Sequence, residues 1–551
     1  MMKKFKLFTI LIALTVVLAG CGSAEGIYSD KGQVFRKVLS QDITSLDSAL
    51  ATDTVSFDMY NQIYEGLYTL DKDDKAQPGV AKEMPKESNG GKTLTIELRK
   101  DAKWSNGDPV TAHDFEFAWK RVVNPETASE YAYIMYDLKN AEDINMGKKD
   151  VDELGVKAVD DHTLKVELNK PIPYINEMFA FGTFMPQNEK VVKKHGQQYG
   201  TTADKTVFNG PFKIEQWRVE DKIQLVKNED YWDKEAVHLD RVNYKVLKDQ
   251  QAGASLYDTG SVDDTVITAD QVDKYEDNAG LKKRLLASTF YIKLNQKTVP
   301  AFKNKDMRLA ISQAINKEGY VNAVKNDGSE ATDGFTSKLT AETPDGKDFA
   351  ETIDSPLSYN PEAAKEHYEK AKKDLGIKDL TFTMNTEDTP SSKISAEYIK
   401  AQVEKTLPGV TMKIKQLPFK QRLNQESSET HEASLSGWGP DYPDPLTFLS
   451  IMTTGAAQNN TGWGSKEYDQ LIEDANGKLL KKPEERNAAM KKAEEMMLED
   501  APVAPIYQKG EAHLTNPQVK GLIYHQIGGD TSLKNVRIDK SIDRETGEKK
   551  E

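Results

Sequence analysis

Apolar and polar side chains alternate along several short stretches of this chain. Every second residue is apolar in four of them: 94–98, 164–168, 380–384 and 410–414. A period of two is the pattern of half-buried β-strands. At 307–315 and 468–475 apolar residues instead recur every three or four positions, which predicts amphipathic helices. Strands mixed with single helices indicate α/β or α+β lobes.

The ends of two helices can be placed from their capping residues. Asn360 and Pro361 together open a helix, and Gly376 closes it. Thr111 and Asp114 have the spacing of a capping box at the start of another helix. These patterns are structural and predict no chemistry.

The first 33 residues have the pattern of a targeting segment. Three lysines among the first six residues precede an apolar run at 7–18, which is too short to span a bilayer as a mature helix. The tetrad that ends at Cys21, Leu-Ala-Gly-Cys, resembles the bacterial lipobox. The resemblance implies a lipoprotein signal peptide at 1–20, acylation of Cys21 with chains such as palmitate, and a small, polar tether at 21–33. The alternative is an ordinary signal peptide with a chance Cys.

Length, charge and cysteine content narrow the class of protein. The chain has 551 residues, too many for one core, so we expect two or three lobes. Its net charge is −14, and loss of the three lysines in 1–20 gives −14 − 3 = −17 for the mature chain. This acidity disfavours binding of nucleic acid or anionic lipid. Because Cys21 is the only Cys, stability must come from the core and not from disulfides.

Sequence motifs for catalysis, metal binding and phosphate binding are absent. The eight His residues are scattered, and no two lie within five positions of each other. Neither a Gly-rich phosphate loop nor a G-x-S-x-G elbow is present. With 88 acidic residues, carboxylate pairs arise by chance and nominate no acid/base pair. We therefore expect no enzyme, no metal site and no cofactor.

Five segments spread along nearly the whole mature chain carry a family resemblance. They are 98–115 (LRKDAKWSNGDPVTAHDF), 209–212 (NGPF), 228–232 (NEDYW), 306–316 (DMRLAISQAIN) and 459–472, which begins with NNTGW. Together and in this order they resemble the family 5 extracellular solute-binding proteins, which include the oligopeptide- and dipeptide-binding proteins of ABC importers. In 98–115, the Asn-Gly turn tolerates positive φ and Thr111 caps the next helix.

The resemblance implies an α/β fold of the large bilobed periplasmic-binding-protein type. Two lobes with discontinuous segments, joined by a hinge and accompanied by an extra domain, would close around the ligand. We expect lobe I at 34–70, 205–290 and 509–551, the last of which ends in a charged tail. We expect the extra domain at 71–204 and lobe II at 291–508.

The segment 437–442, Gly-Trp-Gly-Pro-Asp-Tyr, resembles the family stretch that binds the ligand. The resemblance implies that Asp441 pairs with a peptide α-ammonium, because a buried ammonium needs an opposite charge. It also implies that the backbone of Gly437, Trp438 and Gly439 pairs with the peptide main chain, a mode that reads no side chains. Pro440 departs from the family pattern and lacks an N–H. The alternative is a rigid surface turn.

A second candidate strip is Thr52, Asp53 and Thr54. Its position resembles that of a family segment that gives the ligand a second backbone strand, whereas the alternative is a polar loop that caps a helix. Trp438 would line a side-chain pocket or pack in the core. Arg422 and His431 lie in a plausible region for the ligand carboxylate, but no motif fixes them there.

The function that follows from the resemblance is capture of oligopeptides by a substrate-binding lipoprotein of an ABC transporter. We expect a monomer outside the bacterial cell membrane, anchored through lipid on Cys21. This protein would deliver peptides to permease subunits with an ATPase. Alternatives within the family are a signalling peptide, a dipeptide, a nickel chelate or a sugar. A lipid-anchored adhesin or enzyme is the alternative from another class.

Overall fold

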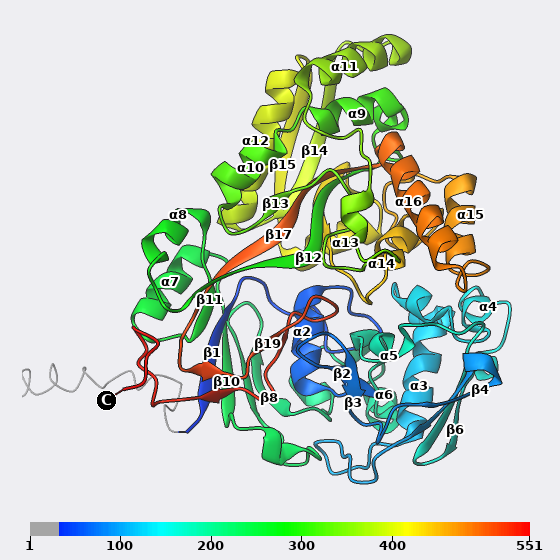
Figure 1. The fold of residues 1–551 in the computed structure, drawn as a ribbon, viewed down its shortest axis with the longest axis vertical. Coiled ribbons are helices and arrows are strands. Elements are labelled where there is room, and N and C mark those ends of the chain that lie inside the picture. The colour runs from blue at the N-terminus through cyan, green and yellow to red at the C-terminus, as the bar shows by residue number, and fades with distance from the viewer. Residues whose placement is uncertain (1–31, 551) are drawn as a thin grey trace, which may run out of the picture.

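Two long strands join the two lobes of the molecule. In the computed structural model, which describes residues 32–550, β12 (Leu281–Leu294) and β17 (Val503–Thr515) pair antiparallel and run from one lobe into the other (Figure 1). Their register shifts between Leu285 and Thr289, so a bulge interrupts the ladder. One eleven-stranded sheet extends through both lobes in the order β15-β14-β16-β12-β17-β11-β1-β10-β9-β8, with β13 (Glu330–Ala331) beside β17.

Lobe II is a sheet with helices on both faces. β14 (Leu380–Glu387) pairs parallel with β15 (Val410–Leu417) and with the start of β16 (Ala433–Trp438), which in turn pairs antiparallel with β12. Its helices are α9 (Lys305–Gln313), α10 (Lys317–Tyr320), α11 (Pro361–Leu375), α12 (Pro390–Thr406), α13 (Phe419–Ser427), α14 (Leu446–Leu449), α15 (Lys466–Ala475) and α16 (Pro483–Asp500). Ile292 and Met384 of the strands pack with Ile311 and Ile399 of the helices.

Lobe I continues the same sheet. β1 pairs parallel with both β10 and β11, and β8, β9 and β10 form an antiparallel meander. The elements are β1 (Val34–Leu39), α2 (Thr54–Ile63), β8 (Phe212–Arg218), β9 (Lys222–Lys227), β10 (Arg241–Val246), α7 (Gln250–Asp258), β11 (Asp264–Val266) and α8 (Ala269–Val272). The chain returns to this lobe after β17 in two short pairs, β18 (Val519–Lys520) with β21 (Arg537–Ile538) and β19 (Ile523–Tyr524) with β20 (Thr531–Ser532).

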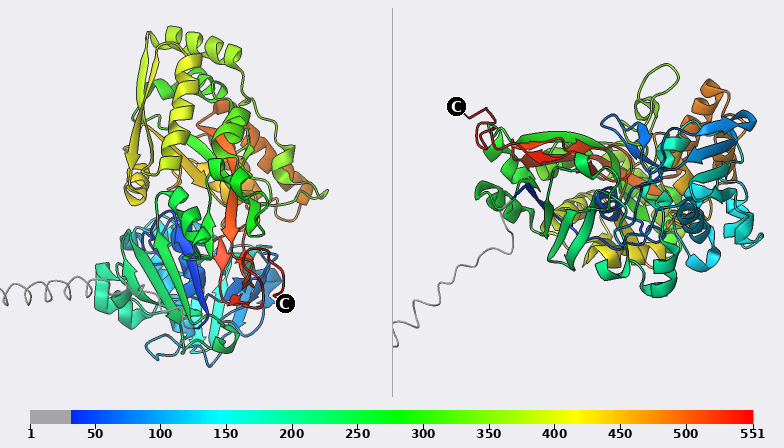
Figure 2. Two further views of the ribbon diagram at one scale, coloured as in Figure 1. Left: turned by 90° about the vertical axis from the view of Figure 1, so that its left-hand side faces the viewer. Right: turned by 90° about the horizontal axis from the view of Figure 1, so that it is seen from below.

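The segment 71–204 packs beside lobe I in the lower part of the molecule, as the side and bottom views of Figure 2 also show. It carries a separate four-stranded sheet in the order β4-β5-β7-β6. The elements here are β3 (Ala76–Pro78), β4 (Lys86–Ser88), β5 (Thr93–Glu97), α3 (Ala112–Val123), α4 (Ala141–Asn145), β6 (Val156–Asp160), β7 (Thr163–Glu167), α5 (Ile175–Met178) and α6 (Glu189–His195). β2 (Tyr68–Leu70), at the end of the first lobe I segment, pairs antiparallel with β3. Its apolar residues share one core with those of lobe I.

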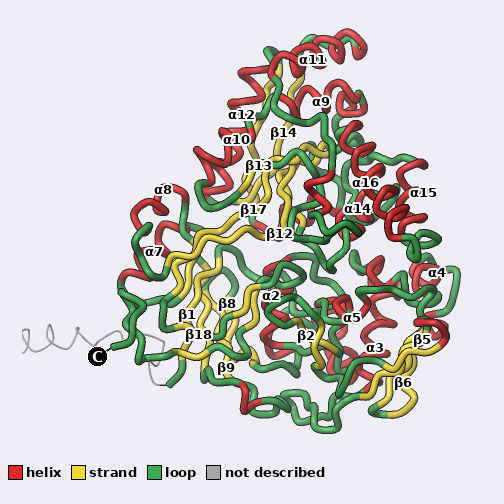
Figure 3. The backbone as a smooth tube through the Cα atoms, viewed as in Figure 1, coloured by secondary structure: helices red, strands yellow, loops and turns green. Residues whose placement is uncertain are grey.

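The locally predicted elements are confirmed (Figure 3). The four alternating stretches become β5, β7, β14 and β15, and the two periodic stretches become α9 and α15. Asn360 caps α11 by accepting from the Ala363 N–H, and Gly376 ends it at a φ of 66°. Thr111 and Asp114 form the predicted capping box.

The lobe boundaries and the targeting segment are two further sets of predictions. The expected lobe boundaries at 290/291 and 508/509 fall inside β12 and β17, the strands shared by the lobes, and the boundaries stay predictions. The signal peptide 1–20, Cys21 and most of the tether lie outside the described residues. No helix in 32–550 is long and apolar enough to cross a membrane.

Candidate ligand-binding site

Carboxyl ends of parallel strands from both lobes face one another. β1 and β10 end at Leu39 and Val246 in lobe I, and β14 ends at Glu387 in lobe II. Just beyond these ends, Gln41 Nε2 donates to Glu387 Oε2 across the boundary at 3.2 Å. In open α/β sheets, ligands bind in the crevice outside the carboxyl ends of the strands. The boundary between the lobes is therefore the first place to seek a site.

β16 has one edge without a strand partner over most of its length. Ala433 and Ser434 pair with β14, but from 435 to 438 the strand pairs with β12 alone among the described residues. Such an edge leaves backbone N–H and C=O groups able to pair with an added extended chain. The predicted backbone contacts Gly437 and Trp438 lie on this open edge.

The two glycines of the segment serve its own packing. A Cβ on Gly437 would lie 2.7 Å from the ring of Phe290, and one on Gly439 would lie 2.7 Å from Ser288 Oγ. We expected these small residues to admit a second backbone. The structure gives another reason for glycine here, because side chains of the 288–290 segment already occupy the space.

Trp438 packs against the core, which is one of the two environments considered for it, and its role in a side-chain pocket stays a prediction. Its indole is half-buried, and Nε1 donates to the Thr447 carbonyl at 3.0 Å. The ring also stacks on Tyr131, with centroids 6.1 Å apart and planes 11° apart. Tyr131 belongs to the segment 71–204, so Trp438 bridges the two sides of the cleft.

Asp441 is a buried carboxyl held between the same two sides. It is 5% exposed, and it accepts from the Tyr131 hydroxyl at 3.2 Å and from the Tyr133 hydroxyl at 3.3 Å. Its own N–H donates to Thr447 Oγ1 at 2.8 Å. Burial raises the pKa of Asp441 to about 8, against the lowering effect of the two tyrosines, and no cation among residues 32–550 offsets this. A carboxyl in this state suits a ligand that brings a positive charge.

The residues around Asp441 fix its loop. The Pro440 carbonyl accepts from the Gly528 N–H at 2.9 Å, and Tyr442 stacks on Tyr174 with centroids 4.8 Å apart. A cavity of about 40 Å³ beside Asp441 has room for two or three waters. The buried hydroxyl of Tyr68, which lines it, has no hydrogen-bond partner in the described chain.

The strip at 52–54 serves mainly to start α2. The buried carboxyl of Asp53 accepts from the Ser56 N–H at 2.8 Å and from the hydroxyls of Thr44 and Ser56. This is the helix-capping alternative, and burial raises the pKa of Asp53. Thr52 is half-buried and Thr54 is exposed. The charge of Asp53 is close enough to Tyr131 to contribute to the raised pKa of the tyrosine, so the strip borders the same cleft.

Arg422 and His431 are committed to contacts inside lobe II. Arg422 is buried, pairs with Glu426, and lies 3.3 Å from Glu387. Although burial opposes it, the charges of Arg422 and Lys293 hold the pKa of Glu426 well below its usual range. His431 is 1% exposed, and burial lowers its pKa. Because Arg422 already pairs with carboxylates of its own lobe, we consider another positive charge that could meet a ligand carboxylate.

Lys325 is such a charge, and sequence reasoning missed it. It ends a π-helical turn, Val321–Lys325, and its side chain is 13% exposed. The nearest carboxylate, on Asp327, is 3.8 Å away, and no acceptor in 32–550 forms a hydrogen bond with the ammonium, which lies 4.8 Å over the Tyr507 ring. Burial lowers the pKa of Lys325. The π-turn is the one local signal, since such turns are frequent at functional sites.

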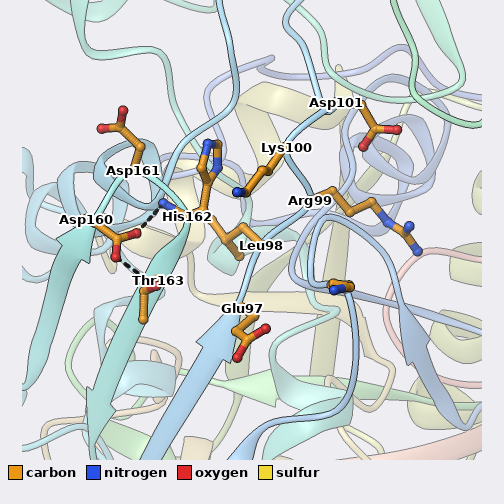
Figure 4. Close-up of a pocket in the computed structure, with 10 residues that line it drawn as sticks. Glu97, Leu98, Arg99, Lys100, Asp101, Asp160, Asp161, His162 and Thr163 are labelled. Atoms are coloured by element: carbon orange, nitrogen blue, oxygen red, sulfur yellow. Dashed lines mark hydrogen bonds between the residues drawn. The ribbon is translucent and has the colours of Figure 1, made fainter.

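A larger hollow, of about 760 Å³, lies on the surface of the segment 71–204 and away from this cleft (Figure 4). It is open and lined mainly by charged side chains, among them Lys100, Asp101 and Asp161. None of the candidate ligand-binding residues lines it. Among the described residues, no cluster of three or more His, Cys, Asp or Glu could hold a metal ion.

Two lobes that close on a buried carboxyl and an open strand edge define the class of extracytoplasmic solute-binding proteins. The chain belongs to the bacterial extracellular solute-binding proteins, family 5, whose model matches residues 75–460. It is 34% identical over 547 residues to a dipeptide-binding protein of Lactococcus lactis, covering 97% of this chain and 98% of that one.

Solved structures show the same similarity. The substrate-binding domain of an oligopeptide ABC transporter from Bacillus anthracis superposes with a TM-score of 0.90 at 42% identity, covering 92% of this chain and 99% of that one. Listeria monocytogenes OppA bound to peptide gives 0.89 at 39% identity, covering 93% and 100%. An unliganded open form of Escherichia coli MppA gives only 0.61, at 26% identity and coverages of 92% and 98%. The lobe arrangement of this chain therefore resembles that of the peptide-bound OppA and differs from the open form, and we call it the closed arrangement.

Proposed function

We propose that this chain is the peptide-binding lipoprotein of an ABC importer. The observation that carries the proposal is Asp441, a buried carboxyl that has no cation among the described residues and lies next to the open edge of β16. The α-ammonium of a peptide supplies the missing charge, and the peptide main chain supplies the missing strand. The names of the similar proteins, which include oligopeptide- and dipeptide-binding proteins, support this ligand class.

Main-chain pairing explains how one site accepts many sequences. Hydrogen bonds along 435–438 are the same for every peptide, so affinity does not depend on reading each side chain. At the other end of the ligand, the ammonium of Lys325 is the candidate partner for a carboxylate, because it is buried and has no hydrogen-bond acceptor within 32–550. No enzymatic step is part of this function.

The ligand test is mass spectrometry of small molecules that co-purify with protein produced without residues 1–21. Peptides of mixed sequence are expected, and their lengths separate an oligopeptide binder from a dipeptide binder. One defined peptide would instead indicate a signal receptor. Absence of any peptide, together with no thermal shift on addition of peptide libraries, would refute the proposal.

The proposed location is the outer face of the cell membrane, with a lipid on Cys21 and a permease–ATPase complex as partner. Support comes from the n-region, apolar run and lipobox at 1–21 and from the family. Cys21→Ser is expected to abolish labelling by radioactive palmitate and to leave uncleaved precursor or released protein. Unchanged labelling would show that the lipid is not on Cys21.

A further inference from the structure

Two groups of polar contacts join the lobes, in addition to a hydrogen bond from Asn326 Nδ2 to the Ala269 carbonyl at 3.3 Å. One group surrounds Asp441 and involves the proposed ligand site. The other joins the ends of the lobe I strands to the ends of β14 and β15, and its contacts are Lys248 Nζ to Asp388 Oδ2 at 3.0 Å, Gln41 Nε2 to Glu387 Oε2 at 3.2 Å, and Lys420 Nζ to the Thr44 carbonyl at 3.0 Å. None of the predicted ligand residues makes one of these three contacts, although the Thr44 hydroxyl also donates to Asp53.

Lys248 is the centre of the second group. Its ammonium lies 2.8 Å from Glu220 of its own lobe and 3.0 Å from Asp388 of lobe II. Within 32–550, Lys248 is the only cation in ion-pair distance of Asp388, and the second carboxylate oxygen of Asp388 is buried without a hydrogen-bond partner. The charge of Asp388 in the closed arrangement is therefore balanced by a residue of the opposite lobe.

Lobe I holds Lys248 in place through a fixed turn. The turn between β8 and β9 contains Glu220, a non-glycine residue at a φ of 60°, a region that few such residues adopt. Buried Asp42 stabilises it by accepting from the Glu220 N–H at 2.6 Å and from Trp217 Nε1 at 3.0 Å. The pair of Glu220 and Lys248 is thus built within one lobe and needs no closure to form.

We propose that Glu220, Lys248 and Asp388 form an ionic clasp that favours lobe closure without contacting the ligand. When the lobes separate, Lys248 stays paired with Glu220 of its own lobe, whereas Asp388 loses Lys248 and is exposed to water. The clasp therefore stabilises only the closed state. The side chains of Lys248 and Asp388 are 30% and 29% exposed, and salt therefore screens the contact. By holding the lobes together, the clasp slows escape of a bound ligand, a consequence that rests on the proposed function.

The experiment measures closure directly. Because Cys21 is the only Cys, protein without residues 1–21 can carry a pair of dyes on cysteines placed at exposed Lys100 and Glu362, one on each side of the cleft. Energy transfer is compared between the wild type, Lys248→Met and Asp388→Asn, and the release rate of a bound peptide is measured in parallel. The control is Arg241→Met, which removes an ion pair of 2.8 Å to Glu215 within lobe I.

Both clasp variants are expected to lower the closed fraction of ligand-free protein and to speed peptide release roughly twofold to fivefold, the effect of a partly exposed ion pair. The double variant should be no worse than either single one, Lys248→Arg should restore closure, and 0.5 M NaCl should open the wild type but not the variants. Equal energy transfer in wild type and clasp variants at low salt would overturn the clasp. That readout needs no peptide, so it stands even if the proposed ligand is wrong.

Discussion

Replacing Asp441 with Asn tests the amine anchor with little change in shape. In ligand-free protein at pH 7 the carboxyl is mostly neutral, because burial raises its pKa to about 8. Tyr131 and Tyr133 each donate to one oxygen of Asp441. The amide oxygen of Asn can accept from one of these hydroxyls, and its NH₂ can donate to the oxygen of the other. The variant should therefore fold normally.

The expected loss of affinity follows from two opposing contributions. Breaking a buried charge pair costs about 3–5 kcal/mol. The wild type, however, must first ionise a group with a pKa of about 8, which costs about 1 kcal/mol at pH 7 and which Asn avoids. The difference is about 2–4 kcal/mol, so peptides with a free amine should bind roughly 30- to 900-fold more weakly to the variant.

The pH dependence gives a sharper readout than affinity alone. The free carboxyl is protonated below pH 8 and the bound one is ionised, so binding releases a proton and wild-type affinity rises about tenfold per pH unit between pH 5 and 7. Above about pH 8 the peptide amine loses its own proton and affinity falls. Asp441→Asn should abolish the rise below pH 7.

Isothermal titration calorimetry in buffers of different ionisation enthalpy measures both affinity and proton release. An N-acetylated peptide is the matched control ligand, and it should bind the two proteins similarly. Urea unfolding checks that the variant folds. At pH 7 the carboxyl of Asp441 is ionised in the unfolded wild type and neutral in the folded one, so the raised pKa lowers wild-type stability as pH rises from about 4 to 8. The Asp441→Asn variant should therefore be at least as stable as the wild type at pH 7. Equal loss for both peptides, or a pH slope that survives in Asn, would refute the amine anchor.

Two further changes test neighbouring parts of the structure. Tyr131→Phe removes the 3.2 Å hydrogen bond that opposes the raised pKa of Asp441, so the rise in affinity should move to higher pH, and calorimetry at pH 6–8 would detect an unmoved curve as a contradiction. Asp264→Asn tests a contribution to folding stability. Burial raises the pKa of Asp264, but His513 at 3.4 Å outweighs this and lowers the pKa to about 2. The lowered pKa stabilises the folded protein above about pH 4, and this stabilisation is lost as pH falls toward 2. The variant should lose about 2 kcal/mol in urea unfolding at pH 7 and less at pH 3, and a pH-independent loss would contradict this.

Elements set by local pattern were predictable from sequence, and elements set by distant contacts were not. The alternation at 380–384 and the cap at Asn360 specify β14 and the start of α11 because their causes lie within a few residues. The single sheet that runs through both lobes depends on the pairing of β12 with β17, more than 200 positions apart. No local signal encodes that pairing.

The same division holds within the candidate site. Asp441 could be nominated from its own hexapeptide, but the tyrosines that bind it lie about 310 positions earlier in the chain. Gly437 was predicted to admit a peptide backbone, which stays a prediction, whereas the close contact that the structure shows is with Phe290 of the neighbouring strand, which sequence could not reveal. Lys325 drew no attention because the burial of its ammonium, 3.8 Å from Asp327 and over the Tyr507 ring, is visible only in three dimensions.

The placement of these tyrosines couples amine recognition to closure. Tyr131 and Tyr133 come from the segment 71–204, whereas Asp441 comes from lobe II, so their hydrogen bonds form only when the cleft is shut. Without ligand these bonds join a neutral carboxyl to neutral hydroxyls. An ammonium that ionises Asp441 turns them into charge-assisted bonds, which are roughly twice as strong. In the proposed binding mode, the ligand therefore stabilises the closed state through contacts that it does not itself make. A cation at this position would shift the equilibrium between open and closed lobes more than its own hydrogen bonds alone.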